Sequence, residues 1–176
     1  MAKDHLALYQ KHFVDREHER FDLWKTLAEQ YTVQTALYPG SFVHITPSFV
    51  FSEMVYIDTD KRTRGFFESD SILDFVNQHK IYDEAPSYRF HGQSYAKAIP
   101  EPEQYFDLLI SQWAGFISTH CTEYLKIGGL LLANNSHGDA SMASIDERYE
   151  LMSVVNRRKA KHVISEKNLD SYLIPK

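Results

Sequence analysis

The stretch FDLLISQWAGFISTHCTEYLKIGGLLL, residues 106–132, is the part of the chain that decides its fold class. It opens with residues 106–110, an almost wholly apolar run that is typical of a central parallel strand covered on both faces. Residues 117–127 have helical character, and the glycine pair at 128–129 is a stop signal for a helix. The apolar run at 130–133 then predicts a further strand. A strand, a helix and a strand in this order indicate a parallel α/β sheet.

The same alternation extends upstream of this stretch. Short β-prone runs that end in polar turns predict three more strands, at residues 35–38, 54–57 and 87–90. The apolar spacing after the second of these runs predicts a helix over much of residues 61–80. Residues 4–31 mix charged and apolar side chains at an incomplete helical spacing, which predicts one or two amphipathic helices.

Downstream, two β-prone runs flank a short basic turn, at residues 149–155 and 162–164. They predict an antiparallel pair at the edge of the sheet. The length is in the usual range of one domain. We therefore expect a single domain over residues 1–176, with an N-terminal helical cap at 1–32 and an α/β core at 33–176.

The composition restricts the classes of function. The 176 residues carry a formal net charge of -5, which argues against broad contact with a nucleic-acid backbone. No apolar run of about 18 residues and no signal sequence is visible, so we expect a cytoplasmic protein without a membrane partner. The single cysteine, Cys121, is expected to be a buried small apolar side chain. The histidines show no metal-ligand spacing, so no metal site is predicted, and motifs for serine hydrolases and phosphate-binding loops are absent.

Polar side chains follow each predicted strand, at its carboxyl end. Open α/β sheets bind ligands outside the carboxyl ends of their strands, near the point where the strand order reverses. This rule selects five segments, Tyr38–Ser41, Asp58–Asp60, His91–Ser94, Ser111–Trp113 and Asn134–Asp139. A carboxylate at the end of the second strand, here Asp58, can accept both hydroxyl protons of a ribose. The sequence thus points to a nucleoside-containing ligand, while a solvated acidic strand end and an ordinary Pro-Gly turn stay open as alternatives.

From Thr35 onward, the order of motifs resembles that of class I S-adenosylmethionine-dependent methyltransferases. The segment ALYPGS at 36–41 stands where that family has its glycine-rich loop, and Asp58 stands where it has an acidic residue. Residues 106–112 and 125–132 are similar to the segments around its fourth and fifth strands, and the late β-prone runs fit its terminal hairpin. The loop departs from the family pattern, because Tyr38 replaces an acidic residue and Gly40 is the loop's single glycine.

The resemblance implies a Rossmann-like fold with S-adenosylmethionine as the cofactor. The residues that it implies for the cofactor site are Tyr38, Gly40, Ser41, Asp58, Gln93, Ser94, Ser111 and Gln112. The methyl acceptor is not identified, and the acidic net charge slightly favours a small molecule over a nucleic acid. The oligomeric state is not indicated.

The polar loop after the last predicted parallel strand carries the candidate catalytic residues. His137 and Asp139 are predicted as a general base and its orienting carboxylate. Such a base is optional, because methyl transfer from a sulfonium chiefly needs positioning, and both residues are also ordinary loop formers. Two functions stay open. One is a methyltransferase of unknown acceptor, and the other is a non-catalytic binding or interaction domain that has kept the fold and lost the cofactor site.

Overall fold

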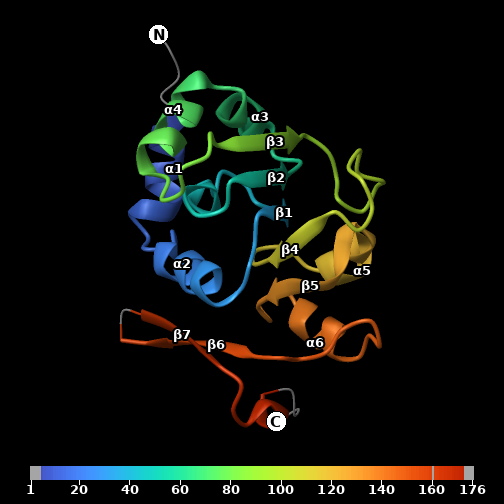
Figure 1. Cartoon of the computed structure of the whole chain (residues 1–176). Helices are drawn as coiled ribbons and strands as arrows, with labels where there is room; N and C mark the ends of the chain where they lie inside the picture. The colour runs from blue at the N-terminus through green and yellow to red at the C-terminus, as the bar shows by residue number, and fades with distance from the viewer. Residues whose placement is uncertain (1–4, 160, 173–176) are drawn as a thin grey trace.

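The computed structural model describes residues 5–159 and 161–172, and its centre is a sheet of five parallel strands (Figure 1). Their order in the sheet is β3-β2-β1-β4-β5. The strands span Thr35–Pro39 (β1), Glu53–Ile57 (β2), Ser87–His91 (β3), Phe106–Ser111 (β4) and Leu125–Ala133 (β5). The strand order reverses between β1 and β4, which is where open sheets of this kind bind ligands. The predicted parallel α/β fold is confirmed.

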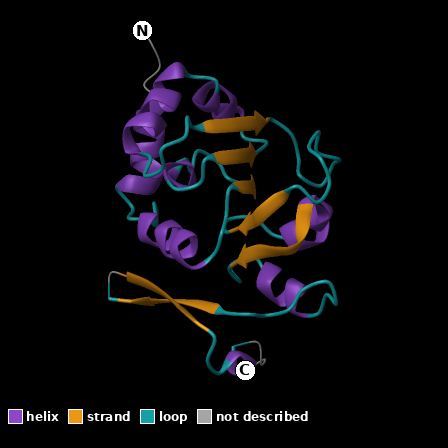
Figure 2. Cartoon of the chain, in the orientation of Figure 1, coloured by secondary structure: helices purple, strands orange, loops and turns teal. Residues whose placement is uncertain are grey.

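Helices cover both faces of the sheet (Figure 2). The N-terminal segment contains two α-helices, of which the first continues into a π-helical turn, and residues 15–20 lead from this turn to the second. The helical stretch predicted after β2 is divided into two helices. The bounds are His5–Tyr9 (α1), Gln10–Val14 (the π-helical turn), Phe21–Gln30 (α2), Lys61–Phe67 (α3), Asp70–His79 (α4), Ile117–Cys121 (α5) and Asp139–Ser144 (α6). Short 3-10 turns lie at Thr46–Phe49, Thr122–Tyr124 and Leu169–Ser171.

Side chains of the central strands alternate between two apolar clusters, as the pleat requires. Tyr38 and Tyr56 belong to the cluster under α1 to α4, whereas Leu37 and Val55 belong to the cluster under α5. Cys121 is fully buried in the second cluster, as predicted, and burial raises the pKa of its thiol to about 12. Within the described residues, none of the helices has the length and apolar character needed to cross a membrane.

The segment predicted as one helix over 117–127 is shorter than expected. α5 ends at Cys121, and β5 already begins at Leu125, so the glycine pair lies inside the strand. Gly128 has a φ of +79°, and the pairing of β5 with β4 is irregular at this point. The positive φ that glycine permits makes an irregularity within the strand possible, and this leaves Ile127 90% exposed.

The last two strands form an antiparallel hairpin, β6 (Val154–Arg158) and β7 (Lys161–Ser165), as predicted. The hairpin does not extend the main sheet and is a separate two-stranded sheet beside α2 (Figure 1). Its Val155 and Ile164 pack against the core. The backbone N–H of His162 donates to the Asp22 carboxylate at 2.8 Å, and its Nδ1 lies 2.6 Å from the same oxygen. These hydrogen bonds hold the hairpin on α2, away from the edge of β5.

Candidate functional site

The carboxyl ends of the parallel strands lie along one edge of the sheet. Pro39 of β1 pairs with Ile57 of β2, and Ile57 pairs with His91 of β3. On the other side of β1, Ser111 of β4 pairs with Ala133 of β5. The polar segments that follow these strands, which the sequence selected, therefore lie at this carboxyl edge.

Tyr38, at the end of β1, lies in the interior. Its hydroxyl is 2.9 Å from Nδ1 of His44, and Nε2 of His44 is 3.0 Å from the carbonyl oxygen of Glu19. A neutral imidazole satisfies both contacts when Tyr38 donates to Nδ1 and Nε2–H donates to Glu19. Burial raises the pKa of Tyr38 and lowers the pKa of His44 to about 3. Tyr38 therefore has a structural partner and presents no carboxylate-like charge to a ligand.

The turn after β1 is closed by the loop after β4. Gly40 has a φ of +65°, and its N–H donates to the carbonyl of Ile57 at 2.8 Å. A β-carbon at Gly40 would lie 2.5 Å from the β-carbon of Ala114, so Ala114 fills the space over the glycine. Ser41 is fully buried, and its hydroxyl donates to the carbonyl of Phe42 at 3.2 Å. This turn leaves no room for a ligand to approach the backbone closely.

Asp58, at the end of β2, holds the two neighbouring turns together. One carboxylate oxygen accepts the N–H of Phe42 at 2.7 Å, and the other accepts the N–H of Asp60 at 2.8 Å. The side chain is partly exposed. Because a carboxylate oxygen has two lone pairs, each oxygen keeps one acceptor position after these bonds. Asp58 is thus the predicted cofactor residue whose position at the edge still allows a hydroxyl donor to bind.

Ser111, at the end of β4, is part of a buried cluster centred on Asp139. Its hydroxyl donates to the Asp139 carboxylate at 2.5 Å. The same carboxylate accepts the hydroxyl and the N–H of Ser118, at 2.6 and 3.1 Å, and Asp139 is 1% exposed. The cluster joins β4, α5 and α6. Ser118 was not selected from the sequence, because a serine within a predicted helix carries no signal of such a contact.

The predicted pairing of His137 with Asp139 is not formed. His137 is exposed, and its Nδ1 lies 3.0 Å from the hydroxyl of the adjacent Ser136. The glycine between the two residues, Gly138, has a φ of +79° and precedes the first residue of α6. The turn therefore sends Asp139 into the interior while His137 stays at the surface.

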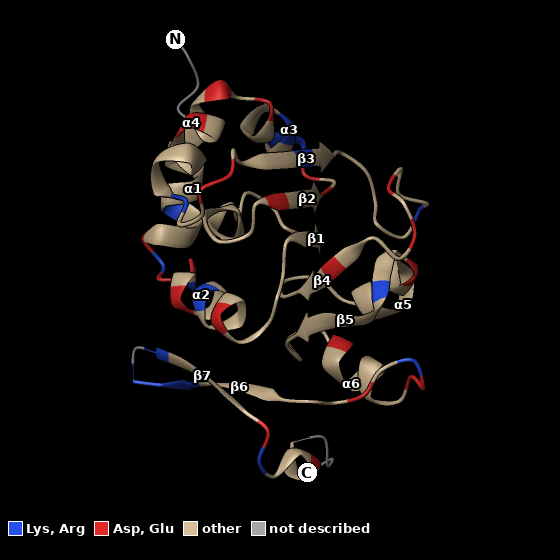
Figure 3. Cartoon of the chain, viewed as in Figure 1, with Lys and Arg blue, Asp and Glu red and all other residues tan. Residues whose placement is uncertain are grey.

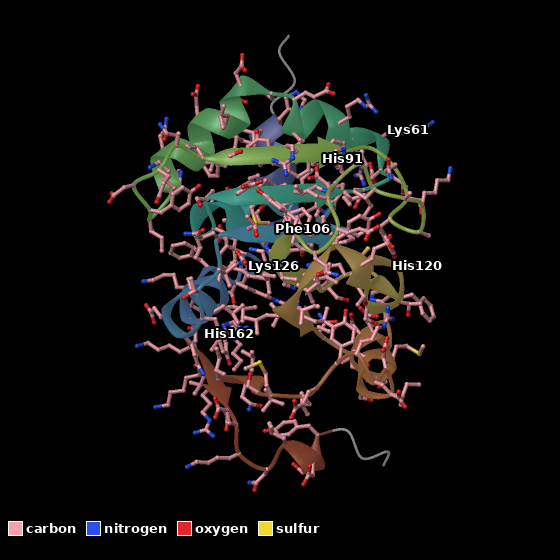
Figure 4. The ribbon with its side chains drawn as sticks, turned by 45° about the vertical axis from the view of Figure 1, so that its right-hand side comes forward. Lys61, His91, Phe106, His120, Lys126 and His162 are labelled. Carbon is pink, nitrogen blue, oxygen red and sulfur yellow. The ribbon has the colours of Figure 1, made fainter. Side chains whose placement is uncertain are left out.

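Gln93 and Ser94 make contacts within their own loop. The Gln93 amide donates to the carbonyl of Ala98 at 3.0 Å, and the Ser94 hydroxyl accepts the N–H of Ala96 at 3.2 Å. The loop is anchored by His91, which Figure 4 labels at the end of β3. Nε2 of His91 lies 2.7 Å from the carboxylate of Glu101. These local bonds account for both polar side chains without a ligand.

Gln112 receives a hydrogen bond from an N-terminal residue that the sequence did not select, Arg20. The guanidinium of Arg20 donates to the side-chain oxygen of Gln112 and lies 4.7 Å from the centre of the Trp113 ring. The ring of His18 is 5.3 Å from the ring of Trp113. Contacts of Arg20 and His18 therefore place the N-terminal segment against the end of β4.

The loop from Trp113 to Phe116 fills the carboxyl edge between the loop that contains Tyr95 and the loop that contains His137. The Tyr95 hydroxyl donates to the carbonyl of Gly115 at 2.9 Å, and a β-carbon at Gly115 would lie 3.1 Å from the carbonyl oxygen of His137. Surface hollows lie away from this edge, near the first residues of β5 and of β3.

This chain resembles known proteins in its fold and not in its sequence. No family model and no curated protein sequence matches this chain. A solved methyltransferase from Geobacter sulfurreducens is 14% identical, with a TM-score of 0.55 over 93% of this chain and 89% of that chain. A SAM-dependent methyltransferase from Aquifex aeolicus is 16% identical, with a TM-score of 0.47 over 73% and 70% of the two chains. A candidate S-adenosyl-L-methionine-dependent methyltransferase from Methanococcus maripaludis is 16% identical, with a TM-score of 0.49 over 69% and 57%.

The similarity to the Geobacter sulfurreducens structure extends over nearly all of both chains and agrees with the β3-β2-β1-β4-β5 order. This chain has the class I methyltransferase fold. The sequence identity of 14% supports the fold alone and says nothing about the reaction. The chain spans 57% of the length of the Methanococcus maripaludis protein.

In a methyltransferase fold, the residues after β1, β2 and β4 are those that would hold S-adenosylmethionine. Here Ala114 covers Gly40, Ser41 is fully buried, and the Ser111 hydroxyl is bonded to Asp139. Asp58 alone keeps a suitable position. In the arrangement that the structure describes, this set of residues does not fit the cofactor.

Proposed function

We propose that this chain is a methyltransferase-fold domain that acts by binding another molecule and does not hold S-adenosylmethionine at its carboxyl edge. The observation that carries the proposal is the contact of Ala114 with Gly40, where an added β-carbon would lie 2.5 Å from the Ala114 side chain. A cofactor that approached the turn after β1 would have to displace the loop from Trp113 to Phe116.

Displacing that loop would cost free energy, because polar contacts hold it. The bond from Tyr95 to Gly115 and the contact of the Arg20 guanidinium with the Trp113 ring would both be lost. A neutral hydrogen bond contributes a net of about 1 kcal/mol, and a cation–π contact about 0.5–2 kcal/mol. Opening the edge would therefore weaken the affinity for a cofactor by roughly 10- to 100-fold.

The test is isothermal titration of the purified protein with S-adenosylmethionine and, separately, with S-adenosylhomocysteine. We expect no saturable heat with either ligand at concentrations up to about 1 mM. The Asp58→Ala variant is measured in parallel, with Asp74→Ala on the exposed face of α4 as the matched control. Micromolar binding that Asp58→Ala abolishes and Asp74→Ala keeps would overturn the proposal.

A second candidate is a methyltransferase that uses S-adenosylmethionine and acts on a small acceptor. The observation in its favour is Asp58, which lies at the end of β2, is partly exposed and keeps an acceptor position on each oxygen. Titration of the wild type beside the Ala114→Gly variant separates the two candidates, because the variant removes the β-carbon that covers Gly40. Under the second candidate the wild type binds S-adenosylmethionine and the variant binds it more tightly, whereas under the first the wild type shows no binding.

A further inference from the structure

Arg20 has an unusual environment for a charged side chain. It immediately precedes α2 with a φ of +54°, it is partly buried, and the central carbon of its guanidinium lies 4.7 Å from the centre of the Trp113 ring. Among the described residues, its guanidinium donates to the neutral side chain of Gln112. A guanidinium has five N–H donors, so most of its donors remain free for another acceptor.

No carboxylate in the described residues compensates the charge of Arg20. The ion pairs of this part of the chain do not include it. The acid next to it along α2, Asp22, is bonded to the N–H and the ring of His162. Burying a charge without a counter-charge is costly, and burial accordingly lowers the pKa of Arg20.

The hairpin brings a second guanidinium to the same region. Arg157 of β6 is directly opposite His162 of β7, and residues opposite each other project from the same face of a hairpin. Because His162 contacts Asp22, this face is turned toward α2. Arg157 is exposed and is in no ion pair among the described residues, and its charge adds to the lowering of the pKa of Arg20. Figure 3 shows the concentration of basic residues on this hairpin.

We propose that Arg20 and Arg157 bind the phosphoryl group of a small molecule where α2, the end of β4 and the hairpin adjoin. Two guanidinium forks from separate elements can each donate two parallel hydrogen bonds, which suits the several oxygens of a phosphoryl group. A phosphomonoester carries a charge of about -1.5 to -2 at neutral pH, which matches two unpaired arginines. A cation–π contact with Trp113 helps to hold the Arg20 guanidinium in place.

The first test is titration of the whole chain with inorganic phosphate at constant ionic strength, followed by the NMR signals of the arginine side chains. We expect the side-chain signals of Arg20 and Arg157 to shift and to reach a plateau as phosphate is added. The affinity for phosphate should be at least about tenfold weaker in both Arg20→Gln and Arg157→Gln. Lys97→Gln, which removes an exposed positive charge in a distant loop, should bind as the wild type does. Binding that is the same in all three variants would overturn the proposal. Because Arg157 is exposed, its variant keeps the test valid even if Arg20→Gln fails to fold.

The second test separates a small molecule from a nucleic acid as the source of the phosphoryl group. Glycerol 3-phosphate and a single-stranded oligonucleotide are titrated in parallel. Tighter binding of glycerol 3-phosphate than of inorganic phosphate, lost in Arg20→Gln, supports the proposal. Tight oligonucleotide binding that is lost in Lys159→Gln and kept in Arg20→Gln would overturn it. S-adenosylmethionine has no phosphoryl group, so its titration tests only the proposed function and can fail or succeed independently of this inference.

Discussion

The buried imidazole of His44 should make the protein lose stability in mildly acidic solution. The side chain is fully buried, stacked on Phe13 with ring centres 4.3 Å apart, and burial lowers its pKa from 6.5 to about 3. In the unfolded chain the same group titrates near its ordinary value. Below pH ~6.5, the unfolded state therefore binds a proton that the folded state does not bind.

Proton linkage gives both the direction and the size of this loss of stability. The stabilisation that comes from a neutral His44 is fully present above the unfolded pKa of 6.5, and it is lost as the pH falls toward the folded pKa of about 3. Between pH 7 and pH 5, the free energy of unfolding should fall by about 2 kcal/mol through this one group.

The assay is urea unfolding at pH 7 and pH 5, followed by circular dichroism, for the wild type and for the variants His44→Asn and His44→Gln. Each variant is expected to be less stable at both pH values, so only the difference between the two pH values is compared. The wild type should lose about 2 kcal/mol more than either variant, because the other titrating groups are shared and cancel. His120→Gln, changed at an exposed histidine, should follow the wild type. An equal loss in the wild type and the His44 variants would refute the reasoning.

Three further changes test the contacts at the carboxyl edge and the hairpin. Gly40→Ala should lower the free energy of unfolding by about 1–3 kcal/mol, since the new β-carbon meets Ala114 and the φ is positive; an unchanged melting temperature would show that the loop moves aside freely. Asp139→Asn should cost about 1–3 kcal/mol in urea unfolding, because the buried donors of Ser111 and Ser118 lose a charged acceptor; a stability equal to that of the wild type would contradict the buried cluster. Asp22→Asn should speed amide exchange in β7 and leave β1 unchanged, and equal protection of β7 in both proteins would show that this contact does not hold the hairpin.

The parallel core could be predicted because its signals are local and repeated. A strand covered on both faces needs apolar residues at successive positions, and Phe106 to Ile110 meets that requirement before any tertiary contact is known. The boundary between α5 and β5 could not be predicted in the same way. A Gly-Gly pair ends a helix as readily as it permits an irregular strand, and the pairing with β4 decided between the two.

The candidate site shows a similar division. The sequence indicated which segments would meet, since parallel strands place their carboxyl ends at one edge. It could not show that Ala114 covers Gly40 or that Asp139 turns inward to Ser118, because these pairs are far apart along the chain and carry no motif. The sequence selected Asp58 by its position after an apolar run. The hydrogen bonds that its carboxylate accepts from the backbone N–H groups of Phe42 and Asp60 are seen only in the structure.

The sequence by itself determined the class of fold, the order of its strands and helices along the chain, and the segments that line the carboxyl edge. Only the tertiary structure decided which polar groups at this edge are already bonded. It also decided that Arg157 lies on the face of the hairpin turned toward α2, and that neither Arg20 nor Arg157 forms an ion pair among the described residues. The physical reason is that apolar periodicity is a local property that each segment carries alone. Hydrogen-bond partners and counter-charges are properties of pairs, and pairs exist only once the chain is folded.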